Sequence, residues 1–227
     1  LCSQFGFGKY DSLVAGGRYH NSKDFMDFPN FGPRYLEFKP QSGIRIKRLD
    51  ERVSIFDSVR DKDIFLYYPY HPFDYAIDLL KTAALDPQVT KIKICLYRVA
   101  RDSRVIDALV NAVQNGKKVL AVVELAARFD EQANINWAQR LTENGIDVIF
   151  GIPGLKVHSK LLLIERKDGN ALRYYSHIGT GNFNEKTARQ YTDFSLITYD
   201  QTIGKDIYDV FEFLQYNYQR PNYRLLL

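Results

Sequence analysis

Residues 91–125 read KIKICLYRVARDSRVIDALVNAVQNGKKVLAVVEL, and this stretch decides the fold class. A strand is predicted over Lys91–Tyr97, and Ser103 can cap a helix whose apolar residues recur at helical spacing. Asn115-Gly116 ends that helix, because glycine tolerates the left-handed conformation that follows a last turn. The apolar run Lys117–Leu125 then predicts a second, buried strand.

The same order of elements recurs immediately downstream. A helix is predicted from Asp130 to Leu141, Asn144-Gly145 ends it, and Ile146–Phe150 is a short strand. Because strand and helix alternate, we predict an α/β fold with a mixed, largely parallel sheet flanked by helices. Further strands are predicted over Ile64–Tyr68, Val157–Ile164, Leu172–Ile178 and Asp193–Thr198, and further helices over Phe73–Ala84 and Ile203–Tyr216.

The first forty residues differ from the rest of the chain. They combine glycines and prolines with many aromatic residues and show little periodicity, which predicts turns and short elements. We interpret residues 1–40 as the C-terminal remnant of a preceding domain and residues 41–227 as a second domain, with a hinge near Pro40–Gly43. The first four residues, Leu1–Gln4, carry neither an initiator Met nor a signal pattern, so we interpret them as an internal cut.

Composition narrows the class of protein. The 227 residues are 45% hydrophobic and 26% charged, which is typical of a globular chain and excludes a disordered or coiled-coil one. The longest apolar run is about five residues, whereas a membrane-spanning helix needs roughly 20, so no membrane span is predicted. The net charge of +4 is dispersed, so it does not indicate nucleic-acid binding but is compatible with an anionic substrate.

The chain contains two cysteines, Cys2 and Cys95. Cys95 lies in an apolar run and is predicted to be a small buried thiol. One terminal and one buried cysteine suggest a reducing compartment. We therefore expect a cytoplasmic protein, with peripheral attachment at the inner face of the membrane as an alternative.

A His-x-Lys pair is the sharpest chemical feature of the sequence. His158 and Lys160 share one face if they lie on a strand, because side chains alternate there. An imidazole beside a fixed positive charge suits attack on phosphorus, since the ammonium can stabilise the phosphoryl oxygens. The alternative is a surface strand end that carries two polar residues.

A glycine-rich turn follows that strand. Gly179, Thr180, Gly181 and Asn182 could let backbone N–H groups approach an anion. The segment matches neither the phosphate-binding loop of nucleotide hydrolases nor a dinucleotide fingerprint. By itself it could equally be an ordinary tight turn.

Two arginines follow predicted parallel strands. Arg98 and Arg128 would emerge at the carboxyl edge of the sheet, where α/β folds bind ligands. Planar guanidinium groups suit phosphate oxygens. Surface ion pairs with Asp102 or Asp130 are the alternative.

The other histidines offer less. His71, between prolines, is interpreted as a turn residue, His177 could support the glycine turn, and His20 cannot be placed. No metal-ligand spacing is present, so any divalent ion would be Mg²⁺ held largely by phosphate and water.

The His-x-Lys segment followed by Gly-Thr-Gly-Asn resembles the half-site of the phospholipase D superfamily. Longer strings resemble the bacterial polyphosphate kinase family, and the resemblance covers almost the whole chain. The strings are residues 16–21 (GGRYHN), 94–103 (ICLYRVARDS), 127–131 (ARFDE), 154–160 (GLKVHSK) and 178–189 (IGTGNFNEKTAR). The resemblance implies that residues 41–227 are the first phospholipase D-like catalytic domain of such a kinase.

The resemblance also implies roles for single residues. His158 matches the histidine that carries the phosphoryl group between ATP and polyphosphate, and Tyr191 matches a tyrosine that contacts the nucleotide. Arg98 and Arg128 match two arginines of the magnesium–phosphate site. A guanidinium is always cationic, so we expect both to hold phosphate oxygens near the Mg²⁺ rather than the ion itself. The acid of the phospholipase pattern is replaced by Glu165 at the nearest position.

The family site consists of two such halves, and this sequence contains one His-x-Lys pair. We therefore expect the 227-residue chain alone to turn over little or no ATP, and the full-length enzyme to be a homo-oligomer that binds ATP, ADP and polyphosphate. A phospholipase D-like phosphodiesterase or nuclease, and a module that only binds polyphosphate, are the competing hypotheses.

Overall fold

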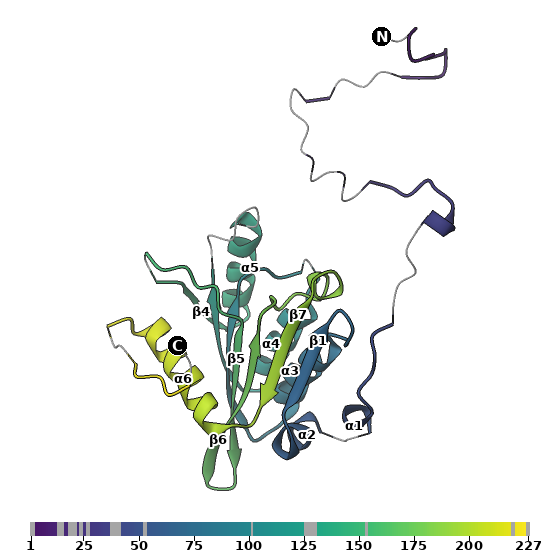
Figure 1. Ribbon diagram of the computed structural model, residues 1–227. Coiled ribbons are helices and arrows are strands. Elements are labelled where there is room, and N and C mark those ends of the chain that lie inside the picture. Colours follow the sequence, from purple (N-terminus) through teal and green to yellow (C-terminus); the bar gives the residue numbers. More distant parts are fainter. Residues whose placement is uncertain are drawn as a thin grey trace. The chain divides into compact units, whose positions relative to one another are not determined.

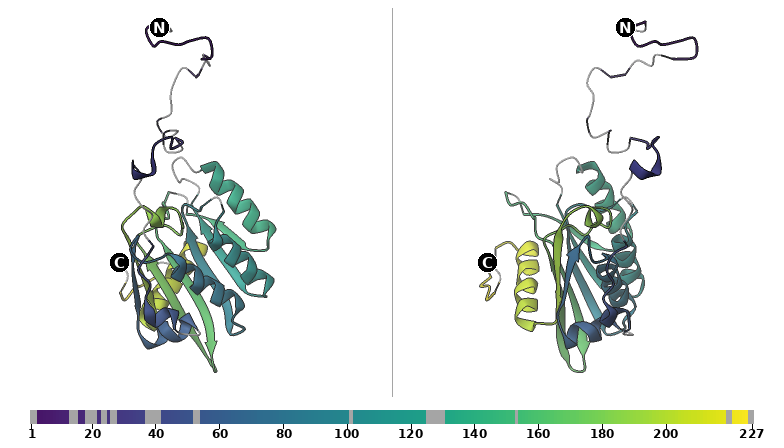
Figure 2. Two further views of the ribbon diagram at one scale, coloured as in Figure 1. Left: turned by 90° about the vertical axis from the view of Figure 1, so that its right-hand side faces the viewer. Right: turned by 45° about the vertical axis from the view of Figure 1, so that its right-hand side comes forward.

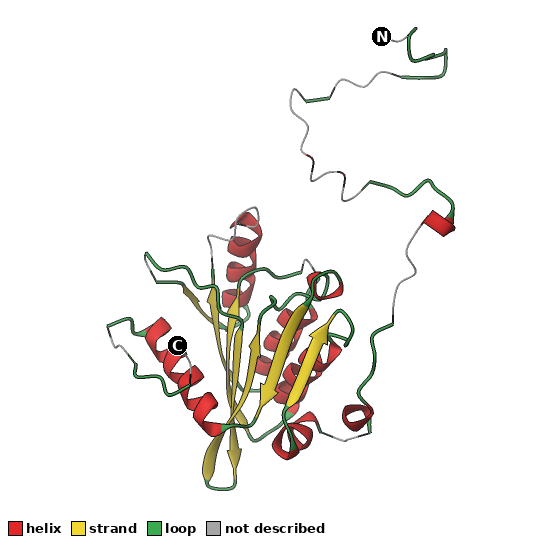
Figure 3. Ribbon diagram, in the orientation of Figure 1, coloured by secondary structure: helices red, strands yellow, loops and turns green. Residues whose placement is uncertain are grey.

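Seven segments rich in branched and aromatic residues form one sheet in the computed structural model, which is coloured by secondary structure in Figure 3. The structure describes residues 3–12, 16–17, 22, 25, 28–36, 42–51, 54–100, 102–124, 131–152, 154–218 and 221–225. The chain divides into two compact units, residues 1–41 and residues 42–227. In the first unit, the described residues form turns and a short 3-10 helix, η2 (Arg34–Leu36), and large apolar side chains such as Tyr10 and Phe31 are exposed.

The second unit contains the sheet and its helices (Figure 1). The strands are β1 (Ile64–Tyr68), β2 (Val89–Leu96), β3 (Lys118–Val123), β4 (Asp147–Phe150), β5 (Leu161–Asp168), β6 (Ala171–Gly179) and β7 (Asp193–Thr198), in the order β1-β7-β6-β5-β2-β3-β4. The helices are α1 (Lys47–Asp50), α2 (Ile55–Asp61), α3 (Asp74–Leu85), α4 (Arg104–Gln114), α5 (Glu131–Glu143), α6 (Gln201–Gln215) and the 3-10 helix η3 (Thr187–Arg189).

The sheet lies between two helical layers. Helices α2 to α5 cover one face, and α6 covers the other, as the right-hand view of Figure 2 shows. Strand side chains alternate between these faces: Leu162 and Ile164 join the larger core under α2 to α5, whereas Leu161 and Leu163 join the smaller core under α6. The sheet is therefore buried on both faces at its centre.

The α/β class is confirmed, but the sheet is less parallel than predicted. Among the described strands, β2–β3 and β3–β4 pair in parallel, whereas the other four pairings are antiparallel. The reason lies in the connections. A parallel pair needs a long crossover, and α4 and α5 supply two of them, but β5 and β6 are joined by a tight turn at Gly169, whose φ is +62°.

The predicted strand that begins at Val157 begins instead at Leu161. The backbone N–H of Val157 donates to Glu124 Oε2 at 2.7 Å, so it is not part of a strand ladder. The strand is longer at its other end, because Asp168 still pairs with Ala171 across the hairpin. His158 and Lys160 therefore lie in the segment that leads into β5 and not on the strand itself.

Several local predictions are confirmed. Ser103 caps α4 by accepting a hydrogen bond from the N–H of Val105, and Gly116 and Gly145 have φ angles of +76° and +78° at the ends of α4 and α5. Cys95 is buried. The predicted helix start Asp130 lies outside the described residues, as does Cys2. Within the described parts of the chain, no helix combines the length and apolar character that crossing a membrane requires.

Candidate functional site

Three segments meet at one end of the sheet. They are the end of β2, the segment before β5, and the β6–β7 connection. The strand register requires this, because Ile94 pairs with Leu162, Leu161 pairs with Ile178, and Gly179 pairs with Ser195. This end is the carboxyl end of the parallel strands β2 and β3, where α/β sheets bind ligands.

His158 is exposed at this end of the sheet. Its imidazole meets the ring of Tyr97 edge-on, with centroids 4.9 Å apart. Partial burial lowers the pKa of His158, and the positive charges of Lys160, Lys156 and Arg98 lower it further. The imidazole is therefore neutral at neutral pH and open to solvent, as a nucleophile must be.

Lys160 is buried beside His158, with an exposed fraction of 6%. Its ammonium donates a hydrogen bond to the backbone carbonyl of His158 and lies 4.9 Å from the Tyr97 ring centroid. Burial lowers the pKa of Lys160, whereas the carboxylate of Asp193 opposes that shift. Both side chains thus lie against the ring of Tyr97, although the segment that carries them is not the predicted strand.

The Gly179–Asn182 turn packs directly against this pair. The N–H of Gly179 donates to the Lys160 carbonyl at 2.9 Å, and the N–H of Thr180 donates to the Phe194 carbonyl at 3.0 Å. These two groups are therefore not available as anion donors. Gly181 gives its space to the carboxylate of Asp193, since a Cβ there would lie 2.5 Å from Asp193 Oδ2. Asn182 is half-buried, and its side-chain oxygen finds no hydrogen-bond partner among the described residues.

The turn is fixed at its far end by Glu185. The Glu185 carboxylate accepts from the N–H of Arg104 at 2.6 Å and from the Ser103 hydroxyl at 3.3 Å. Both donors belong to the N-terminus of α4, where a negative charge is stabilised. Asn184 then caps η3 by accepting from the N–H groups of Lys186 and Thr187.

The structure describes two of the four remaining candidates, Arg98 and Tyr191. The Arg98 guanidinium carbon is 5.7 Å from the Tyr97 ring centroid, so this residue joins the basic cluster around the ring. Tyr191 is 61% exposed in the β6–β7 connection. Arg128 and His20 lie outside the described residues.

Sequence reasoning missed four residues of this region. Tyr97 and Lys156 border the motifs, with the Lys156 ammonium 5.4 Å from the Tyr97 ring centroid. Asp193 accepts from the Thr180 hydroxyl at 2.7 Å. Glu124 binds the N–H of Val157. Tyr97 and Lys156 could have been found because they lie beside the motifs in the sequence. Asp193 and Glu124 could not, because strand pairing brings them to the site.

Three other polar residues are buried or bonded in ways that leave them unable to contact a substrate at this site. His71 Nδ1 accepts from the N–H of Tyr67, which confirms a turn role. His177 is buried against Phe183, and burial lowers its pKa to about 4. Glu165 is buried 3.9 Å from the ammonium of Lys93, on the side of the sheet that α6 covers.

These residues do not form a protein cage for a divalent cation. No group of three or more His, Cys, Asp or Glu side chains with metal-binding geometry occurs among the described residues. The carboxylates near His158 that the structure describes are already engaged, since Asp193 faces Lys160 and Thr180 and Glu124 accepts from the N–H of Val157. A Mg²⁺ ion bound here would therefore have to be held mainly by phosphate and water oxygens.

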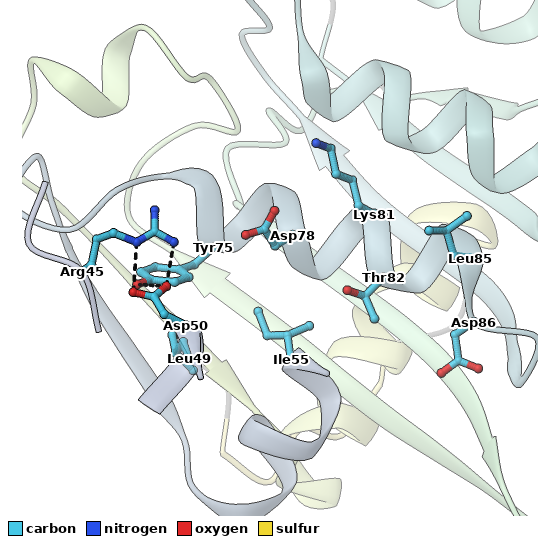
Figure 4. Close-up of a pocket in the computed structure, with 10 residues that line it drawn as sticks. All are labelled: Arg45, Leu49, Asp50, Ile55, Tyr75, Asp78, Lys81, Thr82, Leu85 and Asp86. Carbon is cyan, nitrogen blue, oxygen red and sulfur yellow. Dashed lines mark hydrogen bonds and ion pairs between the residues drawn. The ribbon is translucent and has the colours of Figure 1, made fainter. Parts of the chain in front are cut away.

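A pocket of about 570 Å³ lies away from this site, among α1, α2 and α3 (Figure 4). Its most prominent polar feature is the ion pair between Arg45 and Asp50, to which the hydroxyl of Tyr75 donates. None of the candidate site residues that the structure describes lines it. The pocket is therefore no evidence against a functional site at the end of the sheet.

Solved structures share this architecture. Nuc from Salmonella typhimurium, a phospholipase D family member, superposes with a TM-score of 0.54 at 18% identity, over 72% of this chain and 99% of that one. A likeness at this identity shows the fold alone. The sheet order, the helices on both faces and the His-x-Lys segment at the sheet end define a phospholipase D-like α/β domain.

Sequence comparison is more specific. The family model for polyphosphate kinase C-terminal domain 1 matches residues 54–220. The polyphosphate kinases of Vibrio parahaemolyticus and Escherichia coli K12 are 52% and 53% identical to the chain over all of its length. The crystal structure of polyphosphate kinase from Porphyromonas gingivalis superposes with a TM-score of 0.76 at 37% identity, over 93% of this chain and 35% of that one.

The chain belongs to the polyphosphate kinase family. It spans about a third of the length of the curated relatives it matches.

Proposed function

We propose that this chain supplies the phosphohistidine half of a polyphosphate kinase site, in which the γ-phosphate of ATP is transferred reversibly to polyphosphate through His158. One observation carries the proposal: an exposed imidazole with a lowered pKa lies within a cluster of three cationic side chains, in a chain of the polyphosphate kinase family. The cluster suits a highly charged anionic substrate.

The first step makes a nitrogen–phosphorus bond. A neutral imidazole nitrogen of His158 attacks the γ-phosphorus, the bond from that phosphorus to the bridging oxygen breaks, and ADP leaves with the electron pair. Positioning and electrostatics supply most of the catalysis in phosphoryl transfer. In this proposal Lys160 and Arg98 neutralise charge on the phosphoryl oxygens, and Arg128 is given the same role from the resemblance.

The second step reverses the bond changes. A terminal oxygen of polyphosphate attacks the phosphorus, and the nitrogen–phosphorus bond of His158 breaks. The turn can contribute the N–H groups of Gly181 and Asn182, since those of Gly179 and Thr180 are bonded within the protein. Tyr191 is assigned to the nucleotide, which its exposure permits. Mg²⁺ bound to the phosphates would neutralise part of their charge.

The cellular setting belongs to the same proposal. The relatives' name implies ATP, ADP and polyphosphate as substrates and products, and the buried thiol of Cys95 is consistent with a reducing, cytoplasmic location. Peripheral membrane attachment and a homo-oligomeric full-length enzyme extend this proposal. The 227-residue chain alone is proposed to turn over little or no ATP, because the family site needs a second half.

The test is phosphoryl labelling from γ-labelled ATP. A polyphosphate kinase of the family that carries this sequence should acquire an acid-labile label on His158, and His158→Ala should abolish it. Tyr218→Leu, an exposed substitution outside the site, serves as the matched control. Absence of any label under turnover conditions would overturn the proposal.

The phospholipase D-like fold also supports a phosphodiesterase or nuclease, which would take no label from γ-labelled ATP. A polyphosphate-binding module would bind polyphosphate equally well after His158→Ala, but would lose binding in the double variant Arg98→Ala, Arg128→Ala. Labelling from ATP and binding of polyphosphate therefore distinguish these alternatives from a kinase.

A further inference from the structure

Four groups of the site converge on one aromatic ring, that of Tyr97 at the end of β2. The His158 ring meets it at an interplanar angle of 77°. The ammonium groups of Lys160 and Lys156 lie 4.9 and 5.4 Å from its centroid, and the guanidinium carbon of Arg98 lies 5.7 Å away. All three cations are within the roughly 6 Å over which a ring quadrupole attracts positive charge.

Gathering these cations is unfavourable without a counterpart. Lys160, Lys156 and Arg98 repel one another, and each disfavours protonation of His158. The Asp193 carboxylate offsets part of the charge at Lys160, but a carboxylate also repels an incoming phosphate. The face of an aromatic ring attracts cations without carrying a net charge, so it can hold them together and leave the site attractive to anions.

The backbone of Tyr97 is tied to the segment that carries these groups. Asn134 on α5 donates through one amide nitrogen to the Tyr97 carbonyl at 2.8 Å and to the Glu124 carbonyl at 2.7 Å. The Glu124 carboxylate accepts from the N–H of Val157 at 2.7 Å. These hydrogen bonds fix the backbone of Tyr97 relative to the segment that carries His158.

We propose that Tyr97 is a positioning residue of this site, whose ring gathers Lys160, Lys156 and Arg98 and orients the imidazole of His158 before phosphate binds. The proposal rests on the function proposed above for His158. Tyr97 makes no bond to the reacting phosphorus, and its effect passes through the groups it holds.

The first test is an NMR titration of His158 in the 227-residue chain. Tyr97→Leu removes the ring, so the cations disperse and the pKa of His158 should rise toward its ordinary value. Tyr97→Phe keeps the ring and should titrate as the unaltered chain does. The exposed substitution Tyr218→Leu is the matched control.

The second test is binding of inorganic tripolyphosphate to the same variants. A dispersed cluster has to be reassembled by the ligand, so Tyr97→Leu should weaken binding about fivefold, whereas Tyr97→Phe should stay within about twofold. If the leucine variant does not fold, trifluorinated phenylalanine at position 97 keeps the shape and weakens the ring quadrupole. It should raise the pKa of His158 and weaken binding relative to Tyr97→Phe.

Each proposal can fail separately. An unchanged His158 titration and unchanged tripolyphosphate affinity in the ring-deficient variant overturn the role of Tyr97, even if ATP labels His158. If ATP does not label His158, the kinase function fails, while the titration still decides whether the ring organises the cluster.

Discussion

The carboxylate of Asp193 occupies the space that a side chain at Gly181 would need. A Cβ on Gly181 would lie 2.5 Å from Asp193 Oδ2 and 2.8 Å from the Asp193 Cβ. Asp193 is also held by the Thr180 hydroxyl at 2.7 Å. Gly181 therefore lets the β6–β7 turn close onto the first residue of β7, at the place where the same turn binds the Lys160 carbonyl.

Gly181→Ala should accordingly destabilise the protein. The added methyl group forces Asp193 or the turn to move, and overpacking of this kind lowers the free energy of unfolding by about 1–3 kcal/mol. In an Asp193→Ala background the same change should cost clearly less, because the obstructing carboxylate is gone. Urea unfolding of the four proteins of this cycle measures both values, and an equal cost in both backgrounds would contradict the packing argument.

His177 makes the stability of the chain depend on pH. It is 1% exposed on β6, and burial lowers its pKa to about 4 from the ordinary value of 6.5. The fold therefore favours the neutral ring, while the unfolded chain protonates near the ordinary value. The stability from this difference is fully present above about pH 6.5, is lost as the pH falls toward 4, and amounts to about 3 kcal/mol.

The measurement compares urea unfolding near neutral pH with unfolding near pH 4. His177→Phe replaces the ring by an apolar one of similar shape beside Phe183, so it should remove this part of the pH dependence. The unaltered chain and the variant should then differ mainly at acid pH. If the free energy of unfolding changes with pH to the same extent in both proteins, other groups, such as the carboxylates, account for the acid sensitivity.

Local sequence signals predicted the helical half of the fold. Ser103 caps α4 through a bond to a residue two positions away, and Gly116 ends it at a positive φ, so both signals act within one turn of the chain. Strands β1 and β7 have the predicted bounds, because short runs of apolar residues in the sequence mark where each strand begins and ends. These interactions need no information from distant parts of the sequence.

The rest of the fold depends on partners far apart in the chain. The Val157 N–H is taken by Glu124, 33 residues away, so strand β5 begins later than its apolar pattern predicts. The direction of four strand pairings follows from which connections are hairpins or loops. Asp193 joins the site because it begins β7, whereas Tyr97 follows the last residue of β2, within the string of residues 94–103 that also carries Arg98.

Lys93 carries a buried positive charge that stabilises the buried carboxylate of Glu165. Its ammonium lies 2.8 Å from Glu212 and 3.9 Å from the buried Glu165, and 4.3 Å from the Tyr208 ring centroid. Lys93→Met removes the buried ammonium beside Glu165 and leaves it the partly exposed ammonium of Lys91 at 4.0 Å, so it should lower the free energy of unfolding by about 3 kcal/mol. Adding Glu165→Leu should recover most of that loss, as measured by urea unfolding.

A surface pair supplies the control for this cycle. Lys205 and Asp209 are spaced i,i+4 on α6, and the lysine side chain is 57% exposed. Lys205→Met should cost less than about 1 kcal/mol, because water screens the pair. If Lys93→Met is as mild as Lys205→Met, or if Glu165→Leu gives no recovery, the buried cluster does not have the energetic role that its geometry indicates.

Glu185 couples the glycine turn to helix α4, and its removal should loosen the turn. The carboxylate accepts from the Arg104 N–H at 2.6 Å and the Ser103 hydroxyl at 3.3 Å, so Glu185→Ala loses both bonds and a favourable charge at the helix N-terminus. Hydrogen exchange of residues 179–189 should become about tenfold faster or more.

Ser103→Ala is the matched variant: it removes the α4 cap at a cost of about 1 kcal/mol, yet keeps the bond from Arg104 to Glu185. Exchange in the turn should therefore stay near that of the unaltered chain in Ser103→Ala, and equal acceleration in both variants would mean that α4 stability, rather than the Glu185 contact, holds the turn in place.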